Sequence, residues 1–150
     1  MKIKALLAAS LLIFAASCGK KDSTPVDLDA NTRDFIGTVS VETSDGIIEN
    51  TNVSVSCNFD KNGKTATVIF FGVKFAEKMP MMDITIPDVK IKTGTYSTSL
   101  ECTNVDPIAL GEPNPQYVVT DFSGTMTEDE LSITTNFGDY STTYNGTRKE

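Results

Sequence analysis

From residue 34 to the C-terminus, apolar side chains recur at every second position, in short runs separated by turn-forming residues. The clearest run alternates Val53, Val55, Cys57 and Phe59 with polar residues. A period of two places alternate side chains on opposite faces of a β-strand. No segment of 12 residues has a helical period, so the sequence predicts an all-β chain.

Eight strands account for the pattern, and short turns join most of them. The Asn62-Gly63 pair is the strongest hairpin signal, and a change of parity at Pro87 predicts a bulge. The predicted strands span residues 34–43, 47–59, 65–75, 84–91, 95–105, 116–126, 131–137 and 140–148. The segment 105–115 is predicted to be the longest loop.

Eight strands in up-and-down order predict a closed antiparallel barrel, which leaves no exposed strand edge. A sandwich of two sheets is the alternative. The interior of an eight-stranded barrel is either filled by side chains or holds one small ligand. A chain of 150 residues suits a single domain of this kind.

The N-terminal segment predicts export. Lys2 and Lys4 precede an apolar run at 5–16 that is too short to span a bilayer as a helix. Small residues then precede Cys18, so we predict a signal peptide at 1–17. Residues 18–33 are predicted to form a flexible tether, and 34–150 the barrel domain.

Charge and composition narrow the function classes. The net charge is −7, and removal of the two lysines of the signal peptide makes it −9. An acidic chain without a basic patch is not expected to bind nucleic acid. The chain has no His, the usual general base near neutral pH, and no nucleophile or phosphate-loop motif. We therefore predict a non-catalytic protein without cofactor or metal ion.

The stretch "FAASCG" (14–19) resembles the lipobox of bacterial lipoproteins. The resemblance implies that the Cys18 thiol carries a diacylglyceryl group and that its amine is acylated. Two or more acyl chains anchor a protein stably in a membrane. The alternative is an ordinary signal peptide with an incidental cysteine.

A wider resemblance covers nearly all of residues 33–150. It rests on "FIGTVSV" (35–41), "DKNGKTATVIFFGVKF" (60–75), "ITIPDVKI" (84–91), "FSGTMTEDELSITTNF" (122–137) and "YNGT" (144–147). With the lipobox and tether, these stretches resemble the calycin-like β-barrel lipoproteins of Bacteroides and related Bacteroidota. The resemblance implies a lipocalin-related barrel anchored in the outer membrane. It implies no catalytic residues, and the periplasmic and surface-exposed faces both stay open.

Cys57 and Cys102 are left as a possible pair, because an exported protein enters an oxidising compartment. Each continues the apolar face of its own predicted strand. A disulfide requires the two Cα atoms to lie within about 7 Å, which the sequence does not reveal. The alternative is two small buried apolar residues.

The leading functional prediction is a binding protein for a small apolar or amphiphilic ligand held in the barrel or at its mouth. The interior should then be apolar, and flexible methionines should line the rim. The predicted ligand-binding residues are Phe35, Val39, Val53, Val55, Val68, Phe70, Met79, Met81 and Met82. The same core residues would close the barrel if it is filled.

Two alternatives remain. The first is a filled barrel that presents loops to an envelope protein, as an accessory subunit or an inhibitor. Its predicted contact residues lie in the long loop and are Pro107, Ile108, Leu110 and Pro113. The second is glycan binding by exposed aromatic rings, with Tyr96, Tyr117, Tyr140 and Tyr144 as candidates.

Overall fold

A computed structural model describes residues 32–75 and 80–149 of the chain. Cys18, the signal peptide and Met79 lie outside the described residues. The strands are β1 (Thr32–Thr43), β2 (Gly46–Phe59), β3 (Thr65–Val73), β4 (Met82–Thr93), β5 (Thr98–Cys102), β6 (Ile108–Ala109), β7 (Glu112–Pro113), β8 (Val119–Met126), β9 (Glu130–Phe137) and β10 (Tyr140–Arg148). A 3-10 turn, Pro115–Tyr117, precedes β8.

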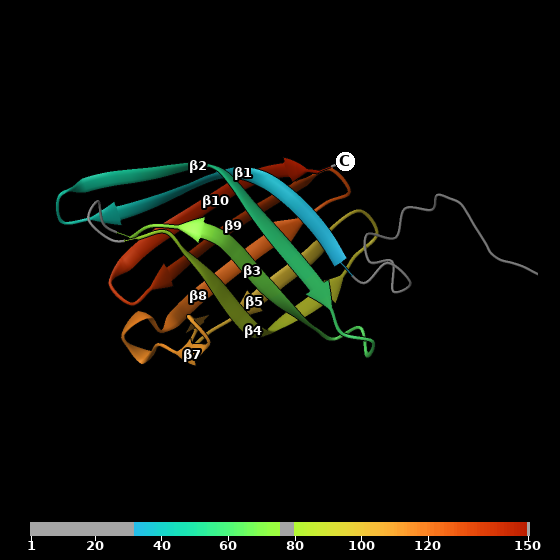
Figure 1. The fold of residues 1–150 in the computed structure, drawn as a ribbon. Helices are drawn as coiled ribbons and strands as arrows, with labels where there is room; N and C mark the ends of the chain where they lie inside the picture. The colour runs from blue at the N-terminus through green and yellow to red at the C-terminus, as the bar shows by residue number, and fades with distance from the viewer. Residues whose placement is uncertain (1–31, 76–79, 150) are drawn as a thin grey trace, which may run out of the picture.

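Eight of these strands form a closed antiparallel barrel (Figure 1). Around the wall the order is β1, β2, β3, β4, β5, β8, β9 and β10, and β10 pairs with β1 to complete the ring. Each strand therefore lies beside its neighbours in the sequence, which is the up-and-down connectivity predicted above. The sandwich alternative is wrong.

The strands begin and end close to their predicted limits, and the differences have local causes. Strand β1 starts at Thr32, and Arg33 is already buried. Strand β5 is shorter than predicted because Gly94 N–H donates to the Ser97 carbonyl, which makes a turn of the first predicted residues. The predicted loop 105–115 contains an extra hairpin, β6–β7, whose first strand pairs with β4.

The predicted bulge in β4 is confirmed. Asp88 directly follows Pro87 and has a φ of 58°, and the register between β3 and β4 shifts between Ala66 and Val68. Such a shift bends the strand and turns the next side chains to new directions. The bulge thus lets both Ile86 and Val89 point into the core although they are three positions apart.

One apolar core fills the barrel. Its largest fully buried side chains include the aromatic rings of Tyr144, Phe35, Phe70, Phe122 and Phe137. Phe70 meets Phe137 and Tyr144 edge to face, with centroids 5.9 Å apart in each pair. Edge-to-face contacts suit the charge distribution of aromatic rings.

The two ends of the barrel hold different sets of turns and connections. The N-terminal end holds Thr32, the turns at 60–64, 94–97 and 127–129, and Arg148. The far end holds the connections β1–β2, β3–β4, β5–β8 and β9–β10. Figure 1 shows the start of β1 on one side of the molecule and β7 on the other. The hairpin β6–β7 therefore lies at the opposite end of the barrel from the start of β1.

The core contains one polar atom that we expect to weaken the fold. Thr98 in β5 is fully buried, and its hydroxyl has no hydrogen-bond partner among the described residues. A buried unsatisfied hydroxyl costs roughly 1–3 kcal/mol. Thr98→Val keeps the shape and removes the hydroxyl, so it should raise the free energy of unfolding by about 1 kcal/mol in urea titrations.

Thr135→Val is the matched control, because the Thr135 hydroxyl donates to the Thr120 carbonyl at 3.1 Å. This variant should lower the free energy of unfolding, since it leaves a carbonyl without its partner. Equal destabilisation by the two substitutions would contradict the assignment of an unsatisfied hydroxyl at Thr98.

Candidate functional site

The interior positions predicted to hold a ligand form part of the closed core. Each of them is at most 2% exposed. A void large enough for water would leave accessible surface on the side chains that line it. The side chains at these positions therefore touch one another rather than a cavity. The six residues are Phe35, Val39, Val53, Val55, Val68 and Phe70.

Aromatic rings close the far end of the barrel. Phe75, which is 1% exposed, stacks on Tyr117 with centroids 5.5 Å apart and also contacts Phe137 and Tyr140. The predicted methionine rim is split: Met81 is 68% exposed, whereas Met82 packs against the core. The far end is thus filled by aromatic rings, with Met81 outside them.

The four tyrosines predicted as glycan-binding candidates differ in exposure and in position on the barrel. Tyr144 is fully buried, so it presents no ring face to solvent. Tyr117 and Tyr140 are half-buried and inclined at 34° to each other, whereas Tyr96 stands exposed at the N-terminal end. These four side chains do not form the flat outer platform expected for stacking on a sugar.

Both cysteines have free thiols in the structure. Cys57 is buried in β2, and Cys102 is half-buried at the end of β5. The two strands are not neighbours, because β3 and β4 lie between them in the wall. Burial raises the pKa of the Cys57 thiol from 9.0 to about 12, and that of Cys102 to about 11. Neither is an activated nucleophile.

These pKa values predict slow alkylation. At pH 8 the thiolate fraction of Cys102 should be about 100-fold lower than that of a thiol with a pKa of 9. Modification by iodoacetamide, followed by peptide mass mapping, should speed up as the pH rises towards 11. Cys57 should stay unmodified until the protein unfolds. Rapid labelling of Cys102 at pH 8 would contradict this environment.

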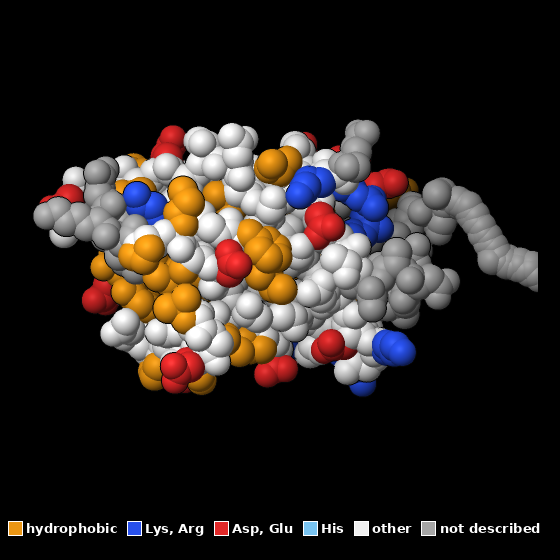
Figure 2. Space-filling model, viewed as in Figure 1, with side chains coloured by type: hydrophobic (Ala, Val, Ile, Leu, Met, Phe, Trp, Pro, Cys, Tyr) orange, Lys and Arg blue, Asp and Glu red, His pale blue; other side chains and the backbone are white. Residues whose placement is uncertain are grey.

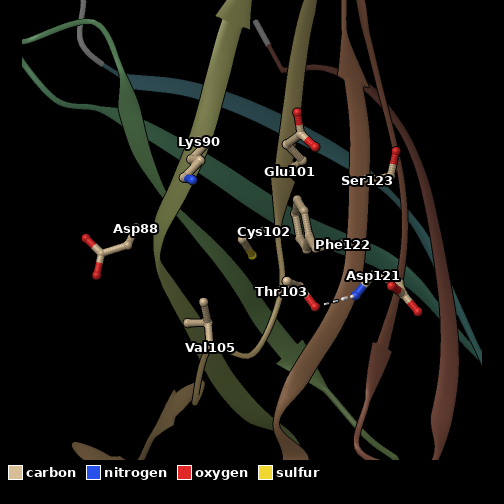
Figure 3. Close-up of a pocket in the computed structure, with 9 residues that line it drawn as sticks. All are labelled: Asp88, Lys90, Glu101, Cys102, Thr103, Val105, Asp121, Phe122 and Ser123. Atoms are coloured by element: carbon tan, nitrogen blue, oxygen red, sulfur yellow. Dashed lines mark hydrogen bonds between the residues drawn. The ribbon is translucent and has the colours of Figure 1, made fainter.

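A groove of about 690 Å³ opens on the outside of the wall where β5 ends (Figure 3). Lys90 of β4 still pairs with Glu101 of β5, but Cys102 has only β8 beside it. The two flanking strands are bent there by residues with positive φ, Asp88 in β4 and Asp121 in β8. The groove is therefore a gap left by two bulges beside a short strand.

The groove combines an apolar floor with charged walls. Its apolar lining comes from Cys102, Val105 and Phe122, and Thr103 accepts a hydrogen bond from Asp121 N–H at 3.4 Å. The carboxylates of Asp88, Glu101 and Asp121 stand at its borders (Figure 3). Lys90 pairs with Glu101 across β4 and β5, whereas Asp121 belongs to β8 on the other side of β5. Among the described residues, no group of three or more carboxylate, thiol or imidazole side chains is arranged to hold a metal ion.

The predicted partner-binding loop is an ordered hairpin. Pro107 is buried and Ile108 half-buried, so these two attach the segment to the barrel. Ile108 and Ala109 pair with Thr85 and Ile84 of β4. Leu110 and Pro113 are exposed, and Leu110, at 86%, is the most exposed large apolar side chain in the described chain.

Asn114 holds the shape of this hairpin. Its side-chain amide donates to the Ala109 carbonyl at 3.3 Å and to the Glu112 carbonyl at 2.8 Å. Its backbone N–H donates to the Pro107 carbonyl at 2.8 Å. The bonds to Ala109 and Pro107 join the two sides of the hairpin below its tip, and the bond to Glu112 fixes the second arm, so the tip has a defined position on the barrel.

Exposed apolar side chains gather at the far end. Ile47 in β2 is 66% exposed, and Met81 and Leu110 belong to the same end. Hydrophobic side chains cluster at this end in the space-filling view (Figure 2). Tyr96 and Ile36 are exceptions, since Tyr96 lies in a turn at the N-terminal end and the less exposed Ile36 lies in the half of β1 nearest that end.

Positive and negative side chains are also distributed unevenly between the two ends of the barrel. At the far end, Lys74 is the only positive side chain that the structure describes, and the carboxylates are exposed. These carboxylates belong to Glu42, Asp45, Glu49, Asp83, Asp106, Glu112 and Asp139. The other described positive side chains lie toward the N-terminal end (Figure 2). They are Arg33, Lys61, Lys64, Lys90, Lys92, Arg148 and Lys149.

The sequence reasoning missed this division, although a signal for it exists. Residues 93–147 contain no Lys or Arg at all. This segment forms nearly all of β5–β10, including the hairpin β6–β7. Its charged side chains are therefore all negative, and the surface that this segment forms carries no positive charge.

Comparison of the chain with family models, curated proteins and solved structures found no match. The calycin-like lipoprotein family stays a prediction from the sequence, because a barrel by itself does not identify a family. Among the described residues, no helix has the length and apolar character needed to cross a membrane.

Proposed function

We propose that this protein is a non-catalytic, lipid-anchored protein of the bacterial cell envelope that binds another protein through the far end of a filled barrel. Cys18 is the proposed lipidated residue, and the outer membrane is the proposed site of the anchor. The observation that carries the proposal is the contrast between a closed interior and an exposed apolar far end.

The geometry favours binding at the far end. A lipid at residue 18 would attach to the barrel through the residues that precede β1, so the far end would lie at the end of the barrel opposite the attachment. Exposed apolar side chains mark protein contact sites on soluble surfaces. Ile47, Met81 and Leu110 supply such side chains there. Ile47 is at the start of β2, and Met81 and Leu110 lie in connections that the strands hold in place.

Two measurements test the anchor. Labelled palmitate should enter the wild-type protein in growing cells, and Cys18→Ser should abolish the label and release the protein from membranes. Protease treatment of intact cells would then distinguish a surface position from a periplasmic one. A labelled Cys18→Ser variant would refute lipidation at this residue.

The interaction itself can be tested by native electrophoresis of mild detergent extracts. The wild-type protein should migrate as a complex, and replacement of Ile47, Met81 and Leu110 by Ser should reduce it to the monomer. Tyr96→Ser is the matched control, because Tyr96 is 78% exposed at the opposite end. A monomeric wild-type protein, or a complex that survives the triple replacement, would overturn the proposal.

A small amphiphilic ligand in the outer groove is the second candidate. The apolar floor of Val105, Cys102 and Phe122 beside carboxylates favours it over a ligand in the barrel interior. Native mass spectrometry would show it as an extra mass that leaves on denaturation. Replacement of Val105 by Asp should remove that mass, and a bare wild-type protein would count against this candidate.

A further inference from the structure

The tip of hairpin β6–β7 carries a residue that neither its backbone conformation nor its surroundings favour. Leu110 has a φ of 56° and Gly111 a φ of 80°, so both central residues of the turn are left-handed. Two-residue hairpin turns of this kind prefer Asn-Gly. A bulky L-residue is an outlier in the left-handed region because its Cβ approaches the backbone.

Packing does not compensate for this strain. The Leu110 side chain is 86% exposed, so it buries almost no apolar surface in the barrel. Strained residues persist where the surrounding structure holds them, and they concentrate at binding sites and clamps. The Asn114 bonds and the β4 pairing of Ile108 and Ala109 hold this turn. Leu110 is thus presented in one position before any partner arrives, which lowers the ordering cost of binding.

The charges around the tip define the chemistry of a partner. Glu112 begins β7 two residues after Leu110, and Asp106 is exposed just before β6. Asp83 stands exposed near the start of β4, the strand that pairs with β6. A second copy of this chain that met the first far end to far end would bring the same negative end to the contact. Phosphate headgroups of a membrane would likewise repel these carboxylates. Positive groups around an apolar recess complement the tip.

We propose that Leu110 is a preformed knob that inserts into an apolar pocket rimmed by Lys and Arg on a protein partner. This inference rests on the proposed interaction function and adds to it the anchoring residue and the chemistry of the partner. Hydrophobic anchors that fill a pocket at the centre of an interface carry a large share of the binding energy.

The test begins with photocrosslinking in cells that express the full chain. Benzoylphenylalanine replaces Glu112, next to the knob, and in a parallel strain it replaces Tyr96 at the opposite end. The crosslinked protein is identified by mass spectrometry and purified, and its Kd is measured for wild type and variants. Position 112 should crosslink one protein that position 96 does not reach.

The variant Leu110→Asn distinguishes an effect on partner binding from an effect on the stability of the fold. Asn accepts the left-handed conformation, so this variant should raise Tm by about 2–5 °C while weakening the partner Kd by about 30-fold. Leu110→Met keeps an apolar side chain and should retain binding within about threefold. Asp106→Asn with Glu112→Gln should slow association at low salt, with little effect at high salt.

The outcomes distinguish the two proposals. A crosslinked partner whose Kd is unchanged by Leu110→Asn would overturn the knob and leave the proposed interaction standing. Crosslinking to lipid at position 112 would overturn the protein partner in favour of a bilayer. No crosslinks at position 112, nor at Asp45 or Asp83, would overturn the interaction function itself.

Discussion

Gly37→Ala should unfold the barrel or lower its free energy of unfolding by roughly 3–5 kcal/mol. Gly37 of β1 lies directly opposite Gly146 of β10. A methyl group on Gly37 would overlap the Asn145 carbonyl oxygen and the Gly146 Cα. These are backbone atoms, so no side-chain rotation relieves the overlap. The first and last strands would have to separate, and their ladder is the one that closes the ring.

Gly63→Ala provides the control for this prediction. Gly63 has a φ of 71° in the β2–β3 turn, and a Cβ there would meet no atom within 4 Å. Only the left-handed conformation is penalised, so the cost should be about 1 kcal/mol. Urea unfolding followed by far-ultraviolet circular dichroism measures both variants. If Gly37→Ala cost no more than Gly63→Ala, the close approach of β1 and β10 would be wrong.

Tyr144→Ala should lower the free energy of unfolding by about 4 kcal/mol. The Tyr144 side chain is fully buried, and its ring meets the edge of Phe70 at 5.9 Å and 89°. It also occupies the space beside Gly146, where any Cβ would overlap the phenol. Removal of the ring leaves a cavity in the wall between β1 and β10.

Tyr144→Phe isolates the hydroxyl of this residue. The hydroxyl donates to the Val53 carbonyl at 3.3 Å, and burial raises the pKa of Tyr144. Loss of this single hydrogen bond should cost about 1 kcal/mol. A cost for Tyr144→Phe as large as that for Tyr144→Ala would mean that the hydrogen bond, rather than the packing of the ring, stabilises this region.

Much of the fold was predictable because the signals were local. The alternation Val53, Val55, Cys57 indicated which face of β2 is buried, and Asn62-Gly63 placed the following turn. The parity change at Pro87 located the bulge at Asp88. Strand parity and turn chemistry depend on neighbours within a few residues, so the sequence reveals them directly.

Whether the barrel interior is filled or hollow was not predictable from local signals. Phe35, Val39 and Phe70 were equally suited to line a ligand cavity and to form a solid core. Which of these occurs depends on whether rings from distant strands meet, and Phe70 in β3 meets Phe137 in β9 and Tyr144 in β10. These contacts join residues 67 and 74 positions apart, so no local pattern contains them.

The sequence by itself determined the all-β class, the eight strands, the up-and-down order and most of the turns, since each follows from side-chain periodicity and turn residues. The tertiary structure alone decided that the core is closed, that Thr98 is buried without a partner, and that Leu110 stands strained at the tip of a short extra hairpin. Those properties depend on which surfaces of remote segments face one another, and only the closed barrel sets that arrangement.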